Sequence, residues 1–211
     1  PRVPAAGGAP AGAAPGSLTL RQAAATGVFW VLTAAFFVGN FTTNAVTTHL
    51  IPFLTDHGYA PATAAAVVGW MGAMQLPARL LFARIAAAFG AYAVTAAVFF
   101  GQAAGVGQLA FLAWLPTLAP AVVVLGAANG MATLARATTV AEIFGPAHYG
   151  SISGAVALGT NGARAVAPVG ASLLMLGLGG YERLFGVLGL ALLGAGLAVV
   201  LTRGGRCLPR P

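Results

Sequence analysis

Residues 22–55 form the stretch QAAATGVFWVLTAAFFVGNFTTNAVTTHLIPFLT, which lies between Arg21 and Asp56 and contains no charged side chain. A helix of about 20 mainly apolar residues is enough to cross the hydrocarbon core of a bilayer. The stretch is therefore long enough for one tilted crossing together with a helix end. It predicts a first membrane span at 22–54, and it decides the fold class.

The composition of the chain also favours a membrane protein. Of 211 residues, 59% are hydrophobic and 6% are charged, whereas about a quarter of the residues in a soluble domain are charged. So few charges cannot cover a surface in water, which excludes a soluble enzyme and predicts the lipid bilayer as a partner. The net charge of +7 comes from arginines scattered between apolar runs, so it does not indicate a nucleic-acid partner.

Turn signals divide the rest of the chain into five further spans. His57 to Pro61 forms the first turn, Trp114-Leu115-Pro116 splits the long uncharged run after Arg84, and Gly145-Pro146 marks a later turn. We expect an all-α integral membrane fold with six transmembrane helices in a domain at 21–203. The predicted spans are 22–54, 61–84, 89–113, 116–140, 148–176 and 181–202.

The arginines predict the orientation of these spans. An even number of crossings puts both termini on one side, and the loops on the opposite side carry only Arg183. The positive-inside rule then predicts that both termini are cytoplasmic and that the spans lie in the plasma membrane. The arginines on the terminal side are Arg2, Arg21, Arg84, Arg203, Arg206 and Arg210.

The two ends of the chain have a different composition from the spans. Residues 1–20 are rich in Pro, Ala and Gly and predict a flexible linker, the end of a central cytoplasmic loop. A linker ahead of the first span suggests a piece of a longer protein. Residues 204–211 form a cytoplasmic tail with the single Cys207, which excludes an intrachain disulfide and a cysteine metal cage.

A short internal repeat relates the second and fifth spans. The segments 69–79 and 154–164 both begin with Gly and end with Ala-Arg, and both have a polar residue four positions before that arginine, Gln75 and Thr160. These spans are the middle members of two groups of three and cross the membrane in opposite directions. The match therefore predicts a 3+3 inverted repeat.

Two longer segments resemble a known family. One is QLPARLLFAR at 75–84, which leads to Phe89-Gly90, and the other runs through 126–154 and includes AEIFG and YGSISG. Both are similar to the C-terminal six-helix half of major facilitator superfamily transporters, in particular to bacterial relatives of the monocarboxylate porters. The resemblance covers about residues 18–203.

The resemblance implies a secondary transporter that works by alternating access, with its small-molecule substrate held between this half and a missing N-terminal six-helix half. It implies no enzyme activity and no cofactor. The porters have an acidic residue four positions before the arginine of the second span, where this chain has Gln75. Proton coupling is therefore not carried over to this position.

Arg164 is the charged residue predicted to lie deepest in the membrane. It falls near the middle of the fifth span, one turn after Asn161, and no carboxylate of the chain is at a comparable depth. An arginine at this depth needs a partner or a water-filled cavity. We expect Arg164, together with Arg79 and Gln75, to bind the carboxylate of an anionic substrate. The alternatives are a structural ion pair with the missing half and snorkelling to the headgroups.

Polar residues of the first span lie on one helical face. They occur at i, i+3, i+4 and i+7, a spacing that predicts either a cavity wall or hydrogen bonds between helices. The resemblance favours a wall, because the first and fourth helices of each half line the family's central cavity. Asn129 of the fourth span would share this wall. The residues of the first span are Asn40, Thr43, Asn44 and Thr47.

Charges near the membrane surfaces predict gates. Arg136 and Glu142 near the inner end of the fourth span, together with Arg84, are expected to form a cytoplasmic gate. At the outer mouth, His49, Asp56 and His57 could form a pH-sensitive gate, although solvated histidines are the favoured interpretation. The third and sixth spans carry few polar side chains, so they are expected to face lipid.

Three functions remain open at this stage. The first is transport of a small organic anion such as a monocarboxylate, the second is efflux of hydrophobic compounds or drugs, and the third is a transport-inactive membrane assembly or sensor subunit. An intramembrane serine protease is disfavoured, because no histidine follows His148 while the Gly-x-Ser at 170–172 does. The dispersed histidines and acids predict no metal site.

Overall fold

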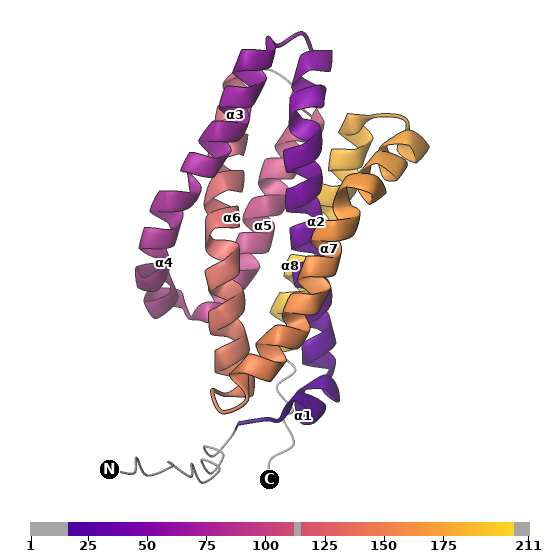
Figure 1. The fold of residues 1–211 in the computed structure, drawn as a ribbon. Helices are drawn as coiled ribbons and strands as arrows, with labels where there is room; N and C mark the ends of the chain where they lie inside the picture. The colour runs from indigo at the N-terminus through magenta and orange to yellow at the C-terminus, as the bar shows by residue number, and fades with distance from the viewer. Residues whose placement is uncertain (1–16, 112–114, 205–211) are drawn as a thin grey trace, which may run out of the picture.

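The computed structural model describes residues 17–111 and 115–204, with side chains for 17–110 and 118–202. The described chain is all-helical, and Figure 1 shows long helices that run alternately up and down an elongated bundle. The helices are α1 Leu20–Ala24, α2 Gly27–Asp56, α3 Pro61–Ala73, α4 Gln75–Phe89, α5 Ala91–Phe111, α6 Leu115–Phe144, α7 Tyr149–Leu178 and α8 Tyr181–Gly204.

The predicted first span is divided into two helices. Thr19 caps the short α1 in a capping box with Gln22, and Thr26 then caps α2 by accepting a hydrogen bond from the backbone N–H of Phe29 at 3.4 Å. A cap residue adopts extended backbone angles and so interrupts a helix. The span therefore begins at Gly27 rather than at residue 22.

The end of the predicted linker belongs to the fold. The backbone N–H of Leu18 donates to the Phe144 carbonyl at the end of α6 over 2.9 Å. Near the same end of the bundle, the Tyr92 and Thr202 hydroxyls lie 3.1 Å apart and connect the start of α5 with the end of α8. The first sixteen residues of the linker, and residues 205–211 of the tail, lie outside the described residues.

The predicted second span consists of α3 and α4, which meet at Met74. Pro77 has no backbone N–H and therefore cannot bond the carbonyl of Ala73, four positions earlier, which accounts for the break. The second helix continues past residue 84 to Phe89, where Gly90 ends it with a φ of 82°. The third span accordingly begins at Ala91, two residues later than predicted.

Helix packing contradicts the expectation that the third span faces lipid. Helix α5 packs against both α6 and α8, and 56% of its most apolar stretch is buried. Its Thr95 hydroxyl lies 2.7 Å from that of Thr139 on α6. By contrast, α8 exposes an apolar face that includes Leu190, Leu197 and Leu201, in agreement with the prediction for the sixth span.

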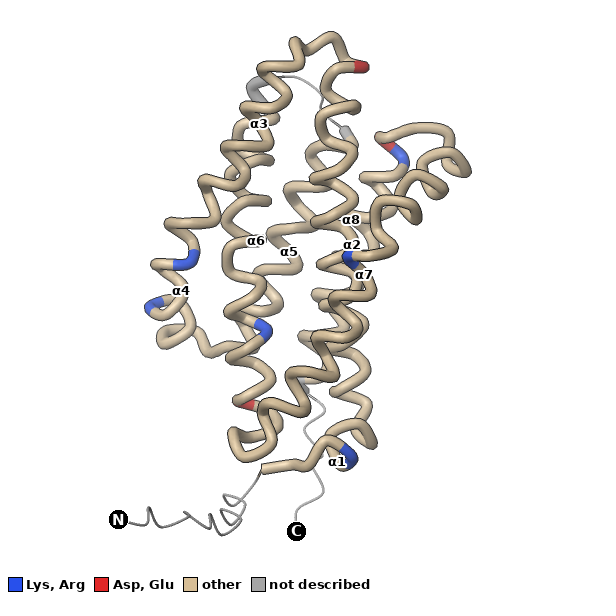
Figure 2. The backbone as a smooth tube through the Cα atoms, viewed as in Figure 1, with Lys and Arg blue, Asp and Glu red and all other residues tan. Residues whose placement is uncertain are grey.

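Within the described ranges, five helical segments are long and apolar enough to cross a membrane, so this is a multi-pass membrane protein. They are Gly27–Asp56, Pro61–Phe89, Ala91–Ala110, Leu118–Phe144 and Tyr181–Thr202. The 30-residue α7 has sufficient length but is not among them, because it contains Asn161, Arg164 and several small or hydroxyl residues. Figure 2 shows how few charged positions occur along the bundle.

Candidate functional site

A cavity of about 410 Å³ lies between α2, α4, α6 and α7, with α5 at its floor. Its lining is dominated by amide, hydroxyl and guanidinium groups, although the surrounding helices are mainly apolar. The lining residues are Phe36, Gly39, Asn40, Thr43, Asn44, Thr47, Gln75, Arg79, Phe99, Gln102, Asn129, Ala132, Thr133, Arg136, Thr160, Asn161 and Arg164.

The structure brings all the predicted substrate-binding residues into this one lining. They come from four helices that are far apart in the sequence. Two members of the predicted gate, Arg84 and Glu142, are not lining residues, whereas the third, Arg136, is. The predicted substrate-binding residues found together are Arg164, Asn161, Arg79, Gln75, Asn40, Asn44, Thr47 and Asn129.

The polar face of α2 bonds mostly to its own helix. The Asn40 amide donates to the Phe36 carbonyl at 3.0 Å, and the Asn44 amide donates to the Asn40 carbonyl at 2.8 Å. The Thr47 hydroxyl donates to the Thr43 carbonyl at 2.8 Å. These bonds use amide donors, so the side-chain oxygens of the two asparagines, both lining residues, can still accept hydrogen bonds.

The floor of the cavity is a three-residue network. The Asn129 side-chain oxygen accepts hydrogen bonds from the Thr43 hydroxyl at 3.0 Å and from the Gln102 amide at 2.8 Å. Gly39 allows α5 to approach, since an added Cβ would lie 3.0 Å from the Phe99 ring and 3.3 Å from Gln102 Oε1. The network thus joins α2, α5 and α6 beneath the cavity.

Gln102 is a lining residue that sequence reasoning missed. It falls in the third span, which the sequence predicts to face lipid. Its side chain is nevertheless 3% exposed, and its Oε1 is buried without a described partner. A buried amide in a membrane span is costly unless it is bonded, and this could have marked the position. Asn44 and Asn129 also have the same separation as Arg79 and Arg164, so the repeat could have been extended to them.

The three arginines of the cavity have neutral partners or none. Arg136 Nη1 donates to the Thr160 hydroxyl at 2.8 Å, while its Nε is buried and unpaired. Arg79 donates to the Gln75 amide oxygen at 3.4 Å. Arg164 is exposed towards the cavity and has no hydrogen bond or ion pair within the described part of the chain. No Asp or Glu is among the lining residues, so the cavity is positively charged.

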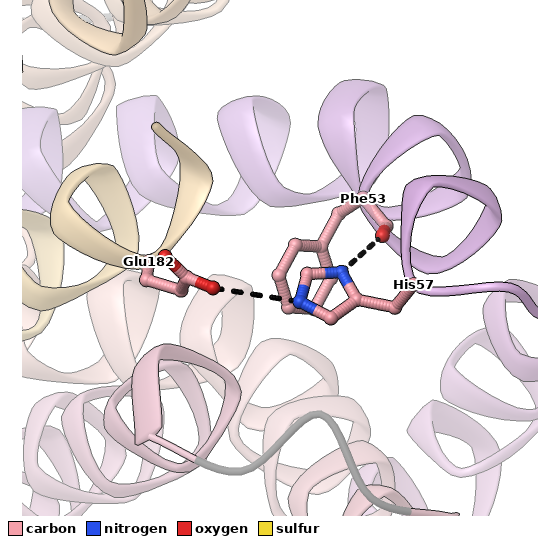
Figure 3. Close-up of polar contacts among 3 residues, drawn as sticks. All are labelled: Phe53, His57 and Glu182. Atoms are coloured by element: carbon pink, nitrogen blue, oxygen red, sulfur yellow. Dashed lines mark hydrogen bonds and ion pairs between the residues drawn. The ribbon is translucent and has the colours of Figure 1, made fainter. Parts of the chain in front are cut away.

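The ion pair of the described residues lies at the opposite end from the predicted cytoplasmic gate. Figure 3 shows His57 Nδ1 beside the Phe53 carbonyl, at 2.8 Å, and His57 Nε2 beside a Glu182 carboxylate oxygen, at 3.4 Å. This pair connects the end of α2 with the start of α8. His49 is 7% exposed. The interpretation as a solvated side chain is therefore wrong for His49, whereas His57 is exposed as well as paired with Glu182.

Ser172 and His49 lie close together but have no geometry for nucleophilic catalysis. Ser172 Oγ is 3.5 Å from His49 Nε2, while its hydroxyl donates to the Pro168 carbonyl at 2.8 Å. The hydroxyl proton is thus directed to the backbone and not to the imidazole, contrary to what a serine–histidine pair needs. No group of three or more histidine, cysteine or acidic side chains in the described ranges could hold a metal ion.

The comparison with protein families identifies the chain. Residues 1–168 match the family model described as Major Facilitator Superfamily, which spans most of the chain and includes the cavity walls from α2, α4 and α6 and most of α7. The comparison with curated proteins found no match. The chain therefore belongs to the major facilitator superfamily, whose members are secondary transporters and not enzymes.

Proposed function

We propose that this transporter carries a small organic anion and binds it in the cavity between α2, α4, α6 and α7. The observation that carries the proposal is the meeting of Arg79, Arg136 and Arg164 in a lining without Asp or Glu. Guanidinium groups remain charged and bind carboxylates through two parallel hydrogen bonds. Monocarboxylates, the substrates suggested by the resemblance to the porters, are one class of such anions.

The pattern of helix contacts supports a 3+3 repeat. With α3 and α4 counted as one span, α2 packs against α7 just as α6 packs against α3 and α4. Likewise α5 packs against α6 as α8 packs against α2, and α5 and α8 pack against each other. These relations exchange in pairs, as expected for two groups of three helices related by a twofold axis. In this arrangement α7 also crosses the membrane, as the fifth of six spans.

The open side of the cavity supports a second six-helix bundle opposite this one. Arg79, Asn161 and Arg164 are exposed, and lipid cannot cover charged groups at this depth without a large cost. The exposed surfaces beside them are apolar, including Leu80 on α4 and Leu158 on α7. A polar centre with apolar flanks fits a partner bundle that shares an aqueous cavity and rocks against this one, with both termini in the cytoplasm.

Transport by the full-length protein in liposomes tests the proposal. We expect uptake of small carboxylates, a loss of at least tenfold in kcat/KM for Arg164→Ala, and partial recovery for Arg164→Lys, because lysine keeps the charge but not the two-point geometry. Arg21→Gln removes an exposed arginine of α1 outside the cavity and is the control. Unchanged uptake of every anion in Arg164→Ala would contradict the role of the cavity.

A second candidate function is efflux of hydrophobic compounds. An apolar cavity of about 280 Å³ lies between α3 and α6 and is lined by residues that include Val67, Trp70 and Val122. Apolar pockets of this kind bind apolar ligands. Dye efflux that is lost in Trp70→Ala but kept in Arg164→Ala would favour this function over anion transport. A bundle that moves neither class of solute would instead fit an assembly or sensor subunit.

A further inference from the structure

The cavity carries more positive charge than a single carboxylate can balance. Arg79, Arg136 and Arg164 supply three guanidinium groups, and their described hydrogen-bond partners, Gln75 and Thr160, are neutral. Like charges in a membrane-spanning site repel one another more strongly than in water. A monoanion would leave two of the three charges uncompensated, whereas a dianion leaves one.

Two of the arginines are neighbours. Arg136 Nη1 lies 2.8 Å from the Thr160 hydroxyl on α7. Arg164 follows Thr160 by four positions on the same helix, so the two side chains leave adjacent turns of one face, with Cβ atoms about 6 Å apart. Arg136 reaches this face from α6. Arg136 and Arg164 thus both border the part of the cavity lining around Thr160.

Each of these arginines has free capacity for an anionic group. Thr160 occupies Nη1 of Arg136, whereas Nη2 of this lining arginine has no hydrogen bond to the described residues and can bind an anionic group. Arg164 uses none of its donors on the described residues and is exposed towards the cavity. The wall therefore offers two separate positions for a carboxylate, each able to form charge-assisted hydrogen bonds.

We propose that the cavity selects small dicarboxylates, with one carboxylate on Arg136 and the other on Arg164. The inference rests on the anion transport proposed above and narrows its substrate class. Thr160 is a positioning residue, because its hydroxyl fixes the Arg136 guanidinium within one turn of Arg164. Arg79 lies on α4, where it donates a hydrogen bond to Gln75, and it binds neither carboxylate in this proposal.

Succinate and butyrate provide the test, since they share a four-carbon chain and differ by one carboxylate. Uptake is measured at pH 7.5, where both succinate carboxylates are ionised, with the full-length protein in liposomes. We expect half-saturation for succinate at a concentration at least tenfold below that for butyrate. Arg136→Gln and Arg164→Gln should each raise the succinate value at least tenfold and abolish the preference over butyrate. Arg21→Gln should change neither value.

Further variants keep the test decisive if the glutamine variants do not fold. Arg136→Lys and Arg164→Lys keep the charges, and each should bind succinate less tightly than the wild type while unfolding at a similar temperature. Thr160→Ala should weaken succinate binding with little effect on butyrate binding. Wild-type affinity for succinate in both lysine variants would overturn the proposal.

The remaining outcomes separate the proposal from the function on which it rests. Equal handling of succinate and butyrate by the wild type would overturn selection of dicarboxylates and leave anion transport in place. A preference for inorganic phosphate over both would overturn it in favour of a single doubly charged group. Failure to move any of the three anions, together with failure of the wider carboxylate panel, would remove the proposed function as well.

Discussion

Asn129 is the residue on which the polar floor of the cavity depends. Its side-chain oxygen accepts hydrogen bonds from Thr43 and Gln102, so Asn129→Ala removes the acceptor of the Thr43 hydroxyl and leaves the Gln102 amide with its long bond to that hydroxyl, at 3.4 Å. A buried donor that loses its acceptor lowers the free energy of unfolding by about 1–3 kcal/mol. We expect a clear fall in the unfolding temperature of the purified protein in detergent. Asn44→Ala is the matched control and should lower it less, because the described bond of that amide joins it to a carbonyl of its own helix. Equal losses in the two variants would contradict the network.

His57 connects α2 to α8 in a way that depends on protonation. Both ring nitrogens face acceptors, the Phe53 carbonyl and the Glu182 carboxylate, so both contacts are hydrogen bonds only when the imidazole is charged.

Glu182→Gln tests this contact. We expect the variant to unfold at a slightly lower temperature than the wild type, because it loses the contact between His57 and the Glu182 carboxylate. The difference should correspond to at most about 1 kcal/mol, because Glu182 is largely exposed and surface pairs are weak. Asp56→Asn removes an exposed carboxylate at the end of α2 that forms no ion pair among the described residues, and it should leave the unfolding temperature unchanged. An unfolding temperature of Glu182→Gln equal to that of the wild type would show that the contact does not stabilise the bundle.

At the scale of helices, two glycines of α6 allow this helix to pack closely against the junction between α3 and α4. A Cβ on Gly126 would lie 2.5 Å from the Met71 carbonyl oxygen, and one on Gly130 would lie 2.6 Å from the Gln75 carbonyl oxygen. Small residues let membrane helices approach this closely. The contact sets where α4 begins, and therefore where Gln75 and Arg79 enter the cavity.

Alanine at these positions should displace α4. We expect Gly130→Ala to lower the stability by about 1–3 kcal/mol, as overpacking of a tight contact does, and to raise KM for the transported anion. Gly154→Ala on α7 is the control, since its added Cβ would meet nothing within 4 Å. Thermal unfolding and uptake are measured on the same preparations. Normal KM in Gly130→Ala would show that α4 does not need this contact to position Arg79.

The elements differ in how well the sequence predicted them. Long uncharged runs indicated α2, α6 and α8 to within a few residues, apart from the cap at Thr26. The face of each helix that packs against the bundle was harder to predict, and α5 is the example. In a bilayer both the lipid and the protein interior are apolar, so hydropathy does not tell which face of a helix is buried. Gln102 was missed for this reason. The face of α2 was predictable because its polar residues repeat at helical spacing.

At the scale of the whole molecule, α7 is the helix on which the proposed architecture depends. It contributes Asn161 and Arg164 to the cavity. It is also more polar than the five described segments that are apolar enough to cross a membrane. The packing of the bundle compensates for this polarity, because Thr160 bonds Arg136 and α7 packs against α2. If α7 crosses the membrane, its two ends are on opposite sides of it.

Cysteine labelling of intact cells tests this crossing. In a background with Cys207→Ser, which removes the single native cysteine, Ser151→Cys and Gly177→Cys introduce thiols at exposed positions near the start and the end of α7. We expect a membrane-impermeant maleimide to label position 177 in intact cells and position 151 only after permeabilisation, since both termini are proposed to be cytoplasmic. Asp56→Cys, at the end of α2, should label like position 177. Labelling of 151 and 177 from the same side would show that α7 does not cross, and it would remove Arg164 from the path of a transported anion. The reverse pattern at all three positions would keep the crossing and invert the orientation, contrary to the positive-inside rule.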